Sequence, residues 1–230
     1  MCGRFTLQHS TAEVAERFEV QEIAFQLTPR YNIAPSQQIA AIVAQTPTTR
    51  KLEQFKWGLV PSWAKEPTIG NRMINARAET LTEKASFKKA FIQRRCIIPA
   101  DGFYEWTGEG RSRKPLYIQR IDRKLFGLAG LWEEWRAPDS STLRSCTIIT
   151  VEPNRFISAI HHRMAVILMP EDEAAWLNPD LNKTDELMKL LKPYPDDLLE
   201  AYPVSTRVNS PSVDDPECLQ PVLSDKLFEI

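Results

Sequence analysis

Residues 96–132 read CIIPADGFYEWTGEGRSRKPLYIQRIDRKLFGLAGLW, and this stretch indicates the class of fold. Short apolar runs alternate in it with glycines and charged residues, a pattern typical of strands joined by hairpins. No helical periodicity separates the runs, which argues against the strand–helix alternation of parallel α/β sheets. The predicted strands in this stretch are residues 96–100, 103–106, 115–120 and 125–132.

The sequence on either side adds strands and a few helices. Predicted strands outside the central stretch are residues 38–44, 52–60, 144–151 and 165–169, and residues 31–35 are predicted to form a turn-rich loop. Predicted helices are residues 10–20, 82–95, 184–191 and one that begins at Pro170. These elements predict one α+β domain over residues 1–230, with a curved, mainly antiparallel sheet or open barrel flanked by helices.

The composition is that of a soluble globular protein, with 230 residues, 43% of them hydrophobic and 26% charged. No apolar run reaches the roughly 18 residues that a membrane span needs, and the first residues lack the apolar core of a signal peptide, so we expect a cytoplasmic protein with no membrane partner. The four cysteines form no C-x-x-C pair and the three histidines lack ligand spacing. We therefore predict no disulfide framework, no metal and no cofactor.

Charge is distributed unevenly along the chain. Residues 1–130 hold 20 Lys and Arg against 12 Asp and Glu, whereas residues 131–230 hold 9 against 18. A basic half suits a polyanion such as a nucleic acid. Chance segregation on a mixed surface gives the same counts, so both interpretations stay open.

The second residue, Cys2, offers unusual chemistry once Met1 is removed. Its α-amine has a pKa of about 7.7–8.0, against about 10.4 for lysine, so far more of it is unprotonated at neutral pH. Such an amine attacks an aldehyde to form a Schiff base. The thiol then closes on the imine carbon and yields a five-membered thiazolidine.

Other interpretations of Cys2 use the same atoms. In an amidohydrolase with an N-terminal nucleophile, the thiol attacks an amide and the amine serves as base. In a non-catalytic nucleic-acid-binding module, a small second residue is incidental. Gly3 allows close approach of a ligand to the backbone, and Arg4 carries a planar charged fork suited to phosphate.

Several motifs in a fixed order resemble the SOS response-associated peptidase (SRAP) family, also called abasic site processing proteins. The similarity runs from Cys2 to about Asn209 and leaves residues 210–230 as a C-terminal extension. Its motifs are CGRF at 2–5, YNIAP at 31–35, WGLVPSW at 57–63, INARAET at 74–80, PADGFYEW at 99–106, GLAGLW at 127–132 and IHHR at 160–163.

The resemblance implies an SRAP fold and a protein that recognises abasic sites in single-stranded DNA. Cys2 is then expected to crosslink covalently to the opened sugar, and Asn75, Glu105 and His161 match the other catalytic positions. The aromatic neighbours of Glu105 should desolvate it and favour its neutral form. A family acid is replaced here by His162, which leaves the protonation state of His161 open. Because adjacent strand residues face opposite ways, we expect only one histidine to face the site.

Further matched positions imply contacts with DNA but little reading of its sequence. Arg77 is expected on the face of Asn75, where it holds a phosphate, and Trp63 is expected to wedge against bases. The resemblance also implies self-removal of Met1 and allows a slow β-elimination (AP-lyase) step. The sequence gives no clear sign of oligomerisation, so we expect a monomer. The expected DNA-binding residues are Arg4, Asn32, Pro35, Trp63, Arg77, Trp106, Thr150 and Arg163.

Overall fold

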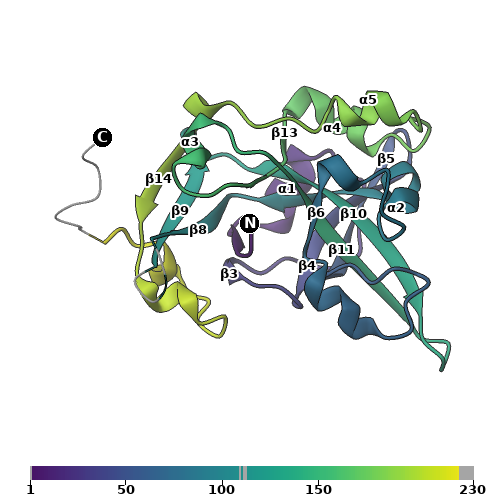
Figure 1. Ribbon diagram of the computed structural model, residues 1–230, viewed down its shortest axis with the longest axis horizontal. Coiled ribbons are helices and arrows are strands. Elements are labelled where there is room, and N and C mark those ends of the chain that lie inside the picture. Colours follow the sequence, from purple (N-terminus) through teal and green to yellow (C-terminus); the bar gives the residue numbers. More distant parts are fainter. Residues whose placement is uncertain (1, 109, 111–112, 223–230) are drawn as a thin grey trace.

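Two β-sheets organise the computed structural model, which describes residues 2–108, 110 and 113–222 (Figure 1). In the first sheet, five strands close into a barrel. Neighbouring strands pair antiparallel around the ring except at one seam, where Cys146 pairs in parallel with Trp57. The barrel strands are β4 (Gln38–Thr46), β5 (Thr49–Trp57), β7 (Arg95–Ala100), β10 (Phe126–Arg136) and β11 (Thr142–Val151).

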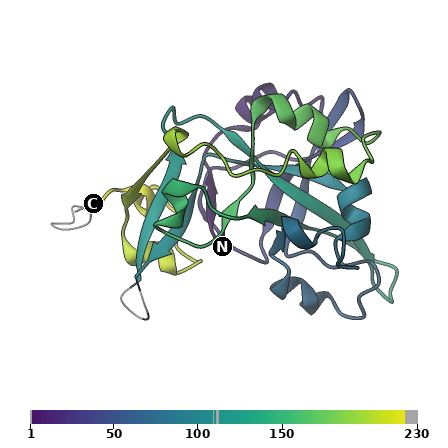
Figure 2. The ribbon, with the colours of Figure 1, turned by 45° about the horizontal axis from the view of Figure 1, so that its top comes forward.

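The second sheet is wholly antiparallel and lies beside the barrel (Figures 1 and 2). The central stretch of sequence serves both sheets, because β7 and β10 belong to the barrel whereas the two strands between them belong to the second sheet. In spatial order the strands are β14 (Leu199–Pro203), β9 (Lys114–Arg120), β8 (Gly102–Thr107), β1 (Phe5–Leu7) and β3 (Arg30–Ile33).

Short elements complete the fold. Strands β2 (Glu22–Ile23), β6 (Asn75–Arg77), β12 (Met164–Ala165) and β13 (Ile167–Leu168) extend the barrel sheet. The α-helices are α1 (Thr11–Arg17), α2 (Lys88–Gln93), α3 (Arg155–Ser158), α4 (Pro170–Leu177) and α5 (Thr184–Met188). The 3-10 helices are η1 (Pro67–Arg72), η2 (Ala78–Thr80), η4 (Asp196–Leu198), η5 (Thr206–Asn209) and η6 (Pro216–Leu219).

The main hydrophobic core fills the barrel and the space between the two sheets. A smaller cluster, formed by Tyr104, Tyr117, Val204 and Val208, lies on the other face of the second sheet. The C-terminal segment that covers this cluster is the yellow ribbon beside β8 and β9 (Figure 1). Among the described residues, no helix has the length and apolar character needed to span a membrane.

The predicted fold class, α+β with a mainly antiparallel sheet, is confirmed, and the parallel seam between β5 and β11 makes the barrel closed. The predicted helix at residues 10–20 is also confirmed, although it ends at Arg17. Its start was readable because Ser10 caps the backbone of Glu13 and the Glu13 side chain bonds back to Ser10.

One predicted element is wrong, one is shorter than predicted and one is divided. Residues 31–33 form a strand instead of a loop, because they pair with β1, and the distant carboxylate of Asp214 accepts the backbone N–H groups of Tyr31 and Asn32. The helix predicted at residues 82–95 is regular only from Lys88 to Gln93, and Arg95 already belongs to β7. The strand predicted at residues 165–169 is divided between β12 and β13, which pair with different strands.

Candidate active site

Cys2 is fully buried just before β1, and the purple segment at the start of the ribbon lies between the two sheets (Figure 1). The ladder between β1 and β8 pairs Phe5 with Phe103, and the N–H of Tyr104 donates to the carbonyl of Arg4 over 3.0 Å. Continued toward the N-terminus, this antiparallel register brings Cys2 alongside the part of β8 that carries Glu105. The thiol of Cys2 lies 3.9 Å from the carbonyl of Arg4.

Asn75 approaches Cys2 from the barrel side. It lies on β6, which pairs with β11, and its amide nitrogen donates to the carbonyl of Cys2 over 3.0 Å. Its side-chain oxygen Oδ1 is buried and has no hydrogen-bond partner among the described residues. Since buried acceptors are normally paired, this oxygen is available to a donor on a bound ligand.

Glu105 supplies a carboxyl group from the second sheet. Its side chain is buried, and burial raises the pKa of the carboxyl group above its ordinary value. The expected desolvation of Glu105 is therefore confirmed. Burial, together with the nearby charge of Glu105, also raises the pKa of the Cys2 thiol to about 12. The thiol is consequently protonated at neutral pH.

His161 is half-buried in the loop after α3, and its Nδ1 accepts the backbone N–H of Arg163 over 3.0 Å. Nδ1 also lies 3.1 Å from the carbonyl oxygen of Arg163, so the ring finds a backbone partner there in either tautomer. Burial is the largest of the influences that lower the pKa of His161, and the neighbouring His162 also lowers it, so the ring is neutral at neutral pH.

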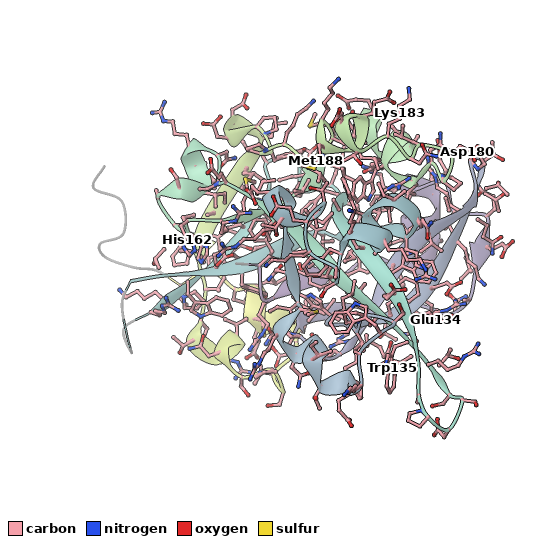
Figure 3. All side chains as sticks on the ribbon, turned by 45° about the vertical axis from the view of Figure 1, so that its right-hand side comes forward. Glu134, Trp135, His162, Asp180, Lys183 and Met188 are labelled. Carbon is pink, nitrogen blue, oxygen red and sulfur yellow. The ribbon has the colours of Figure 1, made fainter. Side chains whose placement is uncertain are left out.

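The two histidines do not face opposite ways, as strand geometry had led us to expect. They lie in a loop, and their rings stack with centroids 4.3 Å apart and an angle of 27° between the planes. His162 is exposed; Figure 3 labels it. A loop imposes no alternation of side chains, which explains the difference.

Arg113 is a residue of the site that the sequence analysis missed. Its positive charge opposes the effect of burial on the pKa of Glu105, and it is the smallest of the influences on the lowered pKa of His161. It is itself exposed on the segment that leads into β9. Arg113 is one of two arginines in RSRK, and no motif around it indicated a role in the site.

Three of the expected DNA-binding residues are accessible on the surface or close to it. Trp63 is 57% exposed. Arg77 is exposed and lies two residues after Asn75 on β6, so that the two side chains share a face as expected. Pro35 is half-buried. The contact of each with DNA remains a prediction.

Arg163 and Thr150 are instead buried in the structure. Two nitrogens of Arg163 donate to the carboxylate of Glu79 over 2.8 and 2.9 Å, and one of them also reaches the carbonyl of Thr150 at 2.7 Å. The hydrogen bonds from Arg163 lower the pKa of Glu79. A phosphate could reach Arg163 only by displacing Glu79, so the geometry favours a role for Arg163 in holding β11.

Arg4 and Asn32 are likewise engaged within the protein. A terminal nitrogen of Arg4 donates to the side chain of Asn32 over 2.8 Å and to the carbonyl of Val208 over 2.6 Å. Asn32 is fully buried, and its amide nitrogen donates to three carbonyls between Val208 and Val213. Trp106 is half-buried and donates to Asn209 over 2.7 Å. These three residues fasten the C-terminal segment against β1 and β8.

The structure therefore brings Cys2, Asn75 and Glu105 together from three separate segments. The charge of Arg113 influences the pKa of both Glu105 and His161. All four cysteines are free thiols. Within the described ranges, no group of three or more His, Cys, Asp or Glu side chains is arranged to hold a metal ion. The assembled chemistry is a thiol, a buried carboxyl group with a raised pKa, and an amide with an open acceptor.

Comparison with known proteins identifies relatives over nearly the whole chain. The abasic site processing protein YoqW of Bacillus subtilis is 46% identical over 223 residues, which cover 96% of this chain and 99% of YoqW. The abasic site processing protein HMCES of Gallus gallus is 34% identical, over 84% of this chain and 66% of HMCES.

A solved structure shares the fold. The crystal structure of a protein from Bacteroides thetaiotaomicron superposes with a TM-score of 0.87 at 30% identity and covers 96% of this chain. The family model described as SOS response associated peptidase (SRAP) matches residues 1–211. On these matches and on the barrel-centred architecture, the chain belongs to the SOS response-associated peptidase family.

Proposed function

We propose that the protein recognises abasic sites in single-stranded DNA and crosslinks to them through Cys2. The observation that carries this proposal is the burial of Cys2 between the sheets, with Asn75 on its carbonyl and the charge of Glu105 close to its thiol. Relatives that cover nearly the whole chain are named abasic site processing proteins, which supports an abasic sugar as the substrate.

The reaction requires the α-amine of Cys2, so Met1 must first be removed; we propose that the same site cleaves it. The free amine attacks the C1′ aldehyde of the opened sugar and forms a carbinolamine, which loses water to give an imine. The thiol sulfur then adds to the imine carbon while the thiol proton passes to the nitrogen. The product is a thiazolidine, and one water molecule is released overall.

The surrounding side chains suit these proton transfers. Glu105, whose carboxyl group keeps its proton to higher pH because burial raises its pKa, donates a proton to the departing hydroxyl of the carbinolamine. His161, with its lowered pKa, exchanges protons at the ring oxygen of the sugar. The open oxygen of Asn75 accepts a hydrogen bond from the sugar or from the new ring.

The high pKa of the thiol favours this order of events over attack of a thiolate on an amide. At a pKa of about 12, almost no thiolate exists at neutral pH in the described structure. A neutral thiol adds readily to an electrophilic imine once the amine has reacted. A slow β-elimination from the same imine would give AP-lyase activity.

We propose that the DNA runs past the accessible residues. Arg77 binds a phosphate next to the trapped sugar, and the exposed Trp63 stacks on an unpaired base. A stacked duplex screens the sugar carbon from a buried cysteine, so an unpaired strand is the favoured substrate. Adduct formation as fast with intact duplex as with single-stranded abasic DNA would contradict this part of the proposal.

Intact-mass spectrometry of the protein mixed with an abasic oligonucleotide tests the crosslink. We expect a stable adduct with one water molecule lost and with Met1 absent from the polypeptide. Cys2→Ala should form no stable adduct. Cys2→Ser retains the amine but lacks the sulfur, so its imine should be trapped by borohydride yet be lost on standing. An equally stable adduct with Cys2→Ala would overturn the proposal.

A further inference from the structure

A mainly apolar cavity of about 730 Å³ lies between helix α3 and the strands β9 and β14. In both ribbon views α3 lies beside these strands (Figures 1 and 2). Such a volume is sufficient for a planar aromatic group. The side chains that line it are Leu116, Arg155, Phe156, Ala159, Ile160, Asp196, Asp197 and Ala201.

This cavity adjoins the candidate active site. Leu116, on its wall, is the direct cross-strand partner of Glu105, and cross-strand partners lie on the same face of a sheet about 5 Å apart. Ile160, on the opposite wall, directly precedes His161. A ligand held near Glu105 and His161 therefore has the cavity as its nearest neighbour on that side.

The charged groups that line the cavity are not paired with one another. Among the described residues, no hydrogen bond or ion pair joins the guanidinium of Arg155 or the carboxylates of Asp196 and Asp197 to another side chain. The half-buried ring of Phe156 lies among them. The cavity thus combines an aromatic ring, two acceptors of N–H hydrogen bonds and one cation that suits a phosphate.

We propose that this cavity binds the unpaired base next to the abasic nucleotide. The base enters the cavity and packs against Phe156, while the carboxylates of Asp196 and Asp197 accept its N–H groups and Arg155 binds its phosphate. The inference rests on the proposed function, because an abasic sugar at Cys2 is what brings a neighbouring base to this wall.

The chemistry of the cavity selects among the bases. Guanine offers a ring N–H and an amino group side by side, which matches a carboxylate acceptor. Adenine and cytosine offer one amino group, whereas thymine offers only a ring N–H. Hydrogen bonds to charged groups are stronger than those between neutral groups, so guanine should be the preferred neighbour and thymine the poorest.

Initial rates of adduct formation test this preference. The substrates are single-stranded oligonucleotides with one abasic site, in which the 5′ neighbour and the 3′ neighbour are varied separately among the four bases. On one of the two sides of the abasic site, we expect adducts to form about tenfold faster when the neighbouring base is guanine than when it is thymine. In the variant with Asp196→Asn and Asp197→Asn, the ratio of the rate with guanine to the rate with thymine should fall to about twofold or less. Ala159→Trp, which fills the cavity, should remove the preference as well.

Asp180→Asn is the control, because it makes the same substitution once, where the double variant makes it twice, at an exposed residue remote from α3. Figure 3 shows Asp180 and His162 well apart. This variant should keep the full preference for guanine. Adducts that form at one rate whatever the neighbouring base, or a preference that survives in the double variant, would overturn the inference alone. Absence of any adduct with every oligonucleotide would overturn the proposed function, and this inference with it.

Discussion

The carboxyl group of Glu105 shows the conflict between stability and chemistry at the scale of one residue. Its folded-state pKa is raised by burial, so the folded protein binds this proton more tightly than the unfolded chain does. The stability that the proton contributes is fully present below the ordinary pKa. It is lost as the pH rises through the raised pKa, where the buried group must ionise.

Glu105→Gln should therefore make the protein slower and, at neutral pH, more stable. The amide keeps the shape of the side chain but neither ionises nor donates the catalytic proton. We expect the rate of adduct formation to fall by about 100-fold. We also expect the melting temperature of the variant, relative to the wild type, to increase between pH 4 and pH 7. A variant that is both slower and less stable at pH 7 would show that Glu105 has a structural role instead.

Part of the site could be predicted from single residues, and part could not. Cys2, Asn75 and Glu105 were named from the sequence, and the structure brings them together because each sits inside an ordered motif on a regular strand or beside one. Arg113 was missed since an exposed arginine has no local pattern. The burial of Asn32 and Arg163 was also not foreseeable, because their partners lie far away in the sequence.

At the scale of the elements, one buried arginine joins two helix ends. Arg95 donates to the carbonyl of Phe91 at the end of α2 and to the carbonyls of Trp176 and Asn178 at the end of α4. The last carbonyls of a helix have no partner within it, and a cation there is favourable. Burial lowers the pKa of Arg95 to about 10, so it stays charged at neutral pH.

Arg95→Met should lower the free energy of unfolding by about 3–5 kcal/mol, because several carbonyls lose the side-chain donor that Arg95 provides. Chemical denaturation at pH 7 measures the change. Arg136→Met, at the exposed end of β10, removes the same charge and should cost no more than about 0.5 kcal/mol. Equal losses in the two variants would contradict the role assigned to Arg95.

The elements that the sequence predicted well are those with local signals. Helix α1 carries its capping box within four residues, and α4 begins with a proline followed by three acidic residues. The N-terminal part of the predicted 82–95 helix and the loop predicted at 31–35 were wrong. Strand β3 depends on Asp214, which lies about 180 residues away, and no local pattern reveals such a partner.

At the scale of the whole molecule, the barrel closes where two glycines meet. Gly58 follows β5, has a positive φ of 128°, and donates its N–H to the carbonyl of Cys146 on β11 over 2.8 Å. A Cβ atom on Gly58 would lie 2.6 Å from the carbonyl oxygen of Gly70, and one on Gly70 would lie 2.5 Å from that of Gly58. The backbones at Gly58 and Gly70 approach each other so closely that neither position has room for a side chain.

Gly58→Ala should therefore destabilise the closed barrel by at least about 2–3 kcal/mol, since it adds a backbone clash to the strain of a positive φ. Gly110→Ala is the matched control, because Gly110 also has a positive φ, of 57°, but a Cβ there meets no atom within 4 Å. Its cost should be limited to about 1 kcal/mol of backbone strain. Thermal unfolding of both variants compares the two, and similar losses would contradict a special role for the seam.

The closure of the barrel could not be predicted from the sequence, for a related reason. Antiparallel neighbours joined by short turns can be predicted from adjacent strand patterns, and the hairpins β8–β9 and β10–β11 follow that rule. The parallel seam instead pairs Trp57 with Cys146, and nothing in either strand indicates the other. The fold class was therefore predictable, whereas the ring that positions β6 and Asn75 was not.

The hydrogen bonds from Arg4 and Asn32 to residues 208–213 can form only after these C-terminal residues have been synthesised. During synthesis on a ribosome, the first strand emerges long before its anchoring carbonyls have been made. The nascent chain therefore carries its reactive cysteine in an unassembled form until almost the entire domain has been translated. An incomplete polypeptide released early would have the sulfur but no assembled site to remove Met1 and free the amine, so it would not act as a crosslinker.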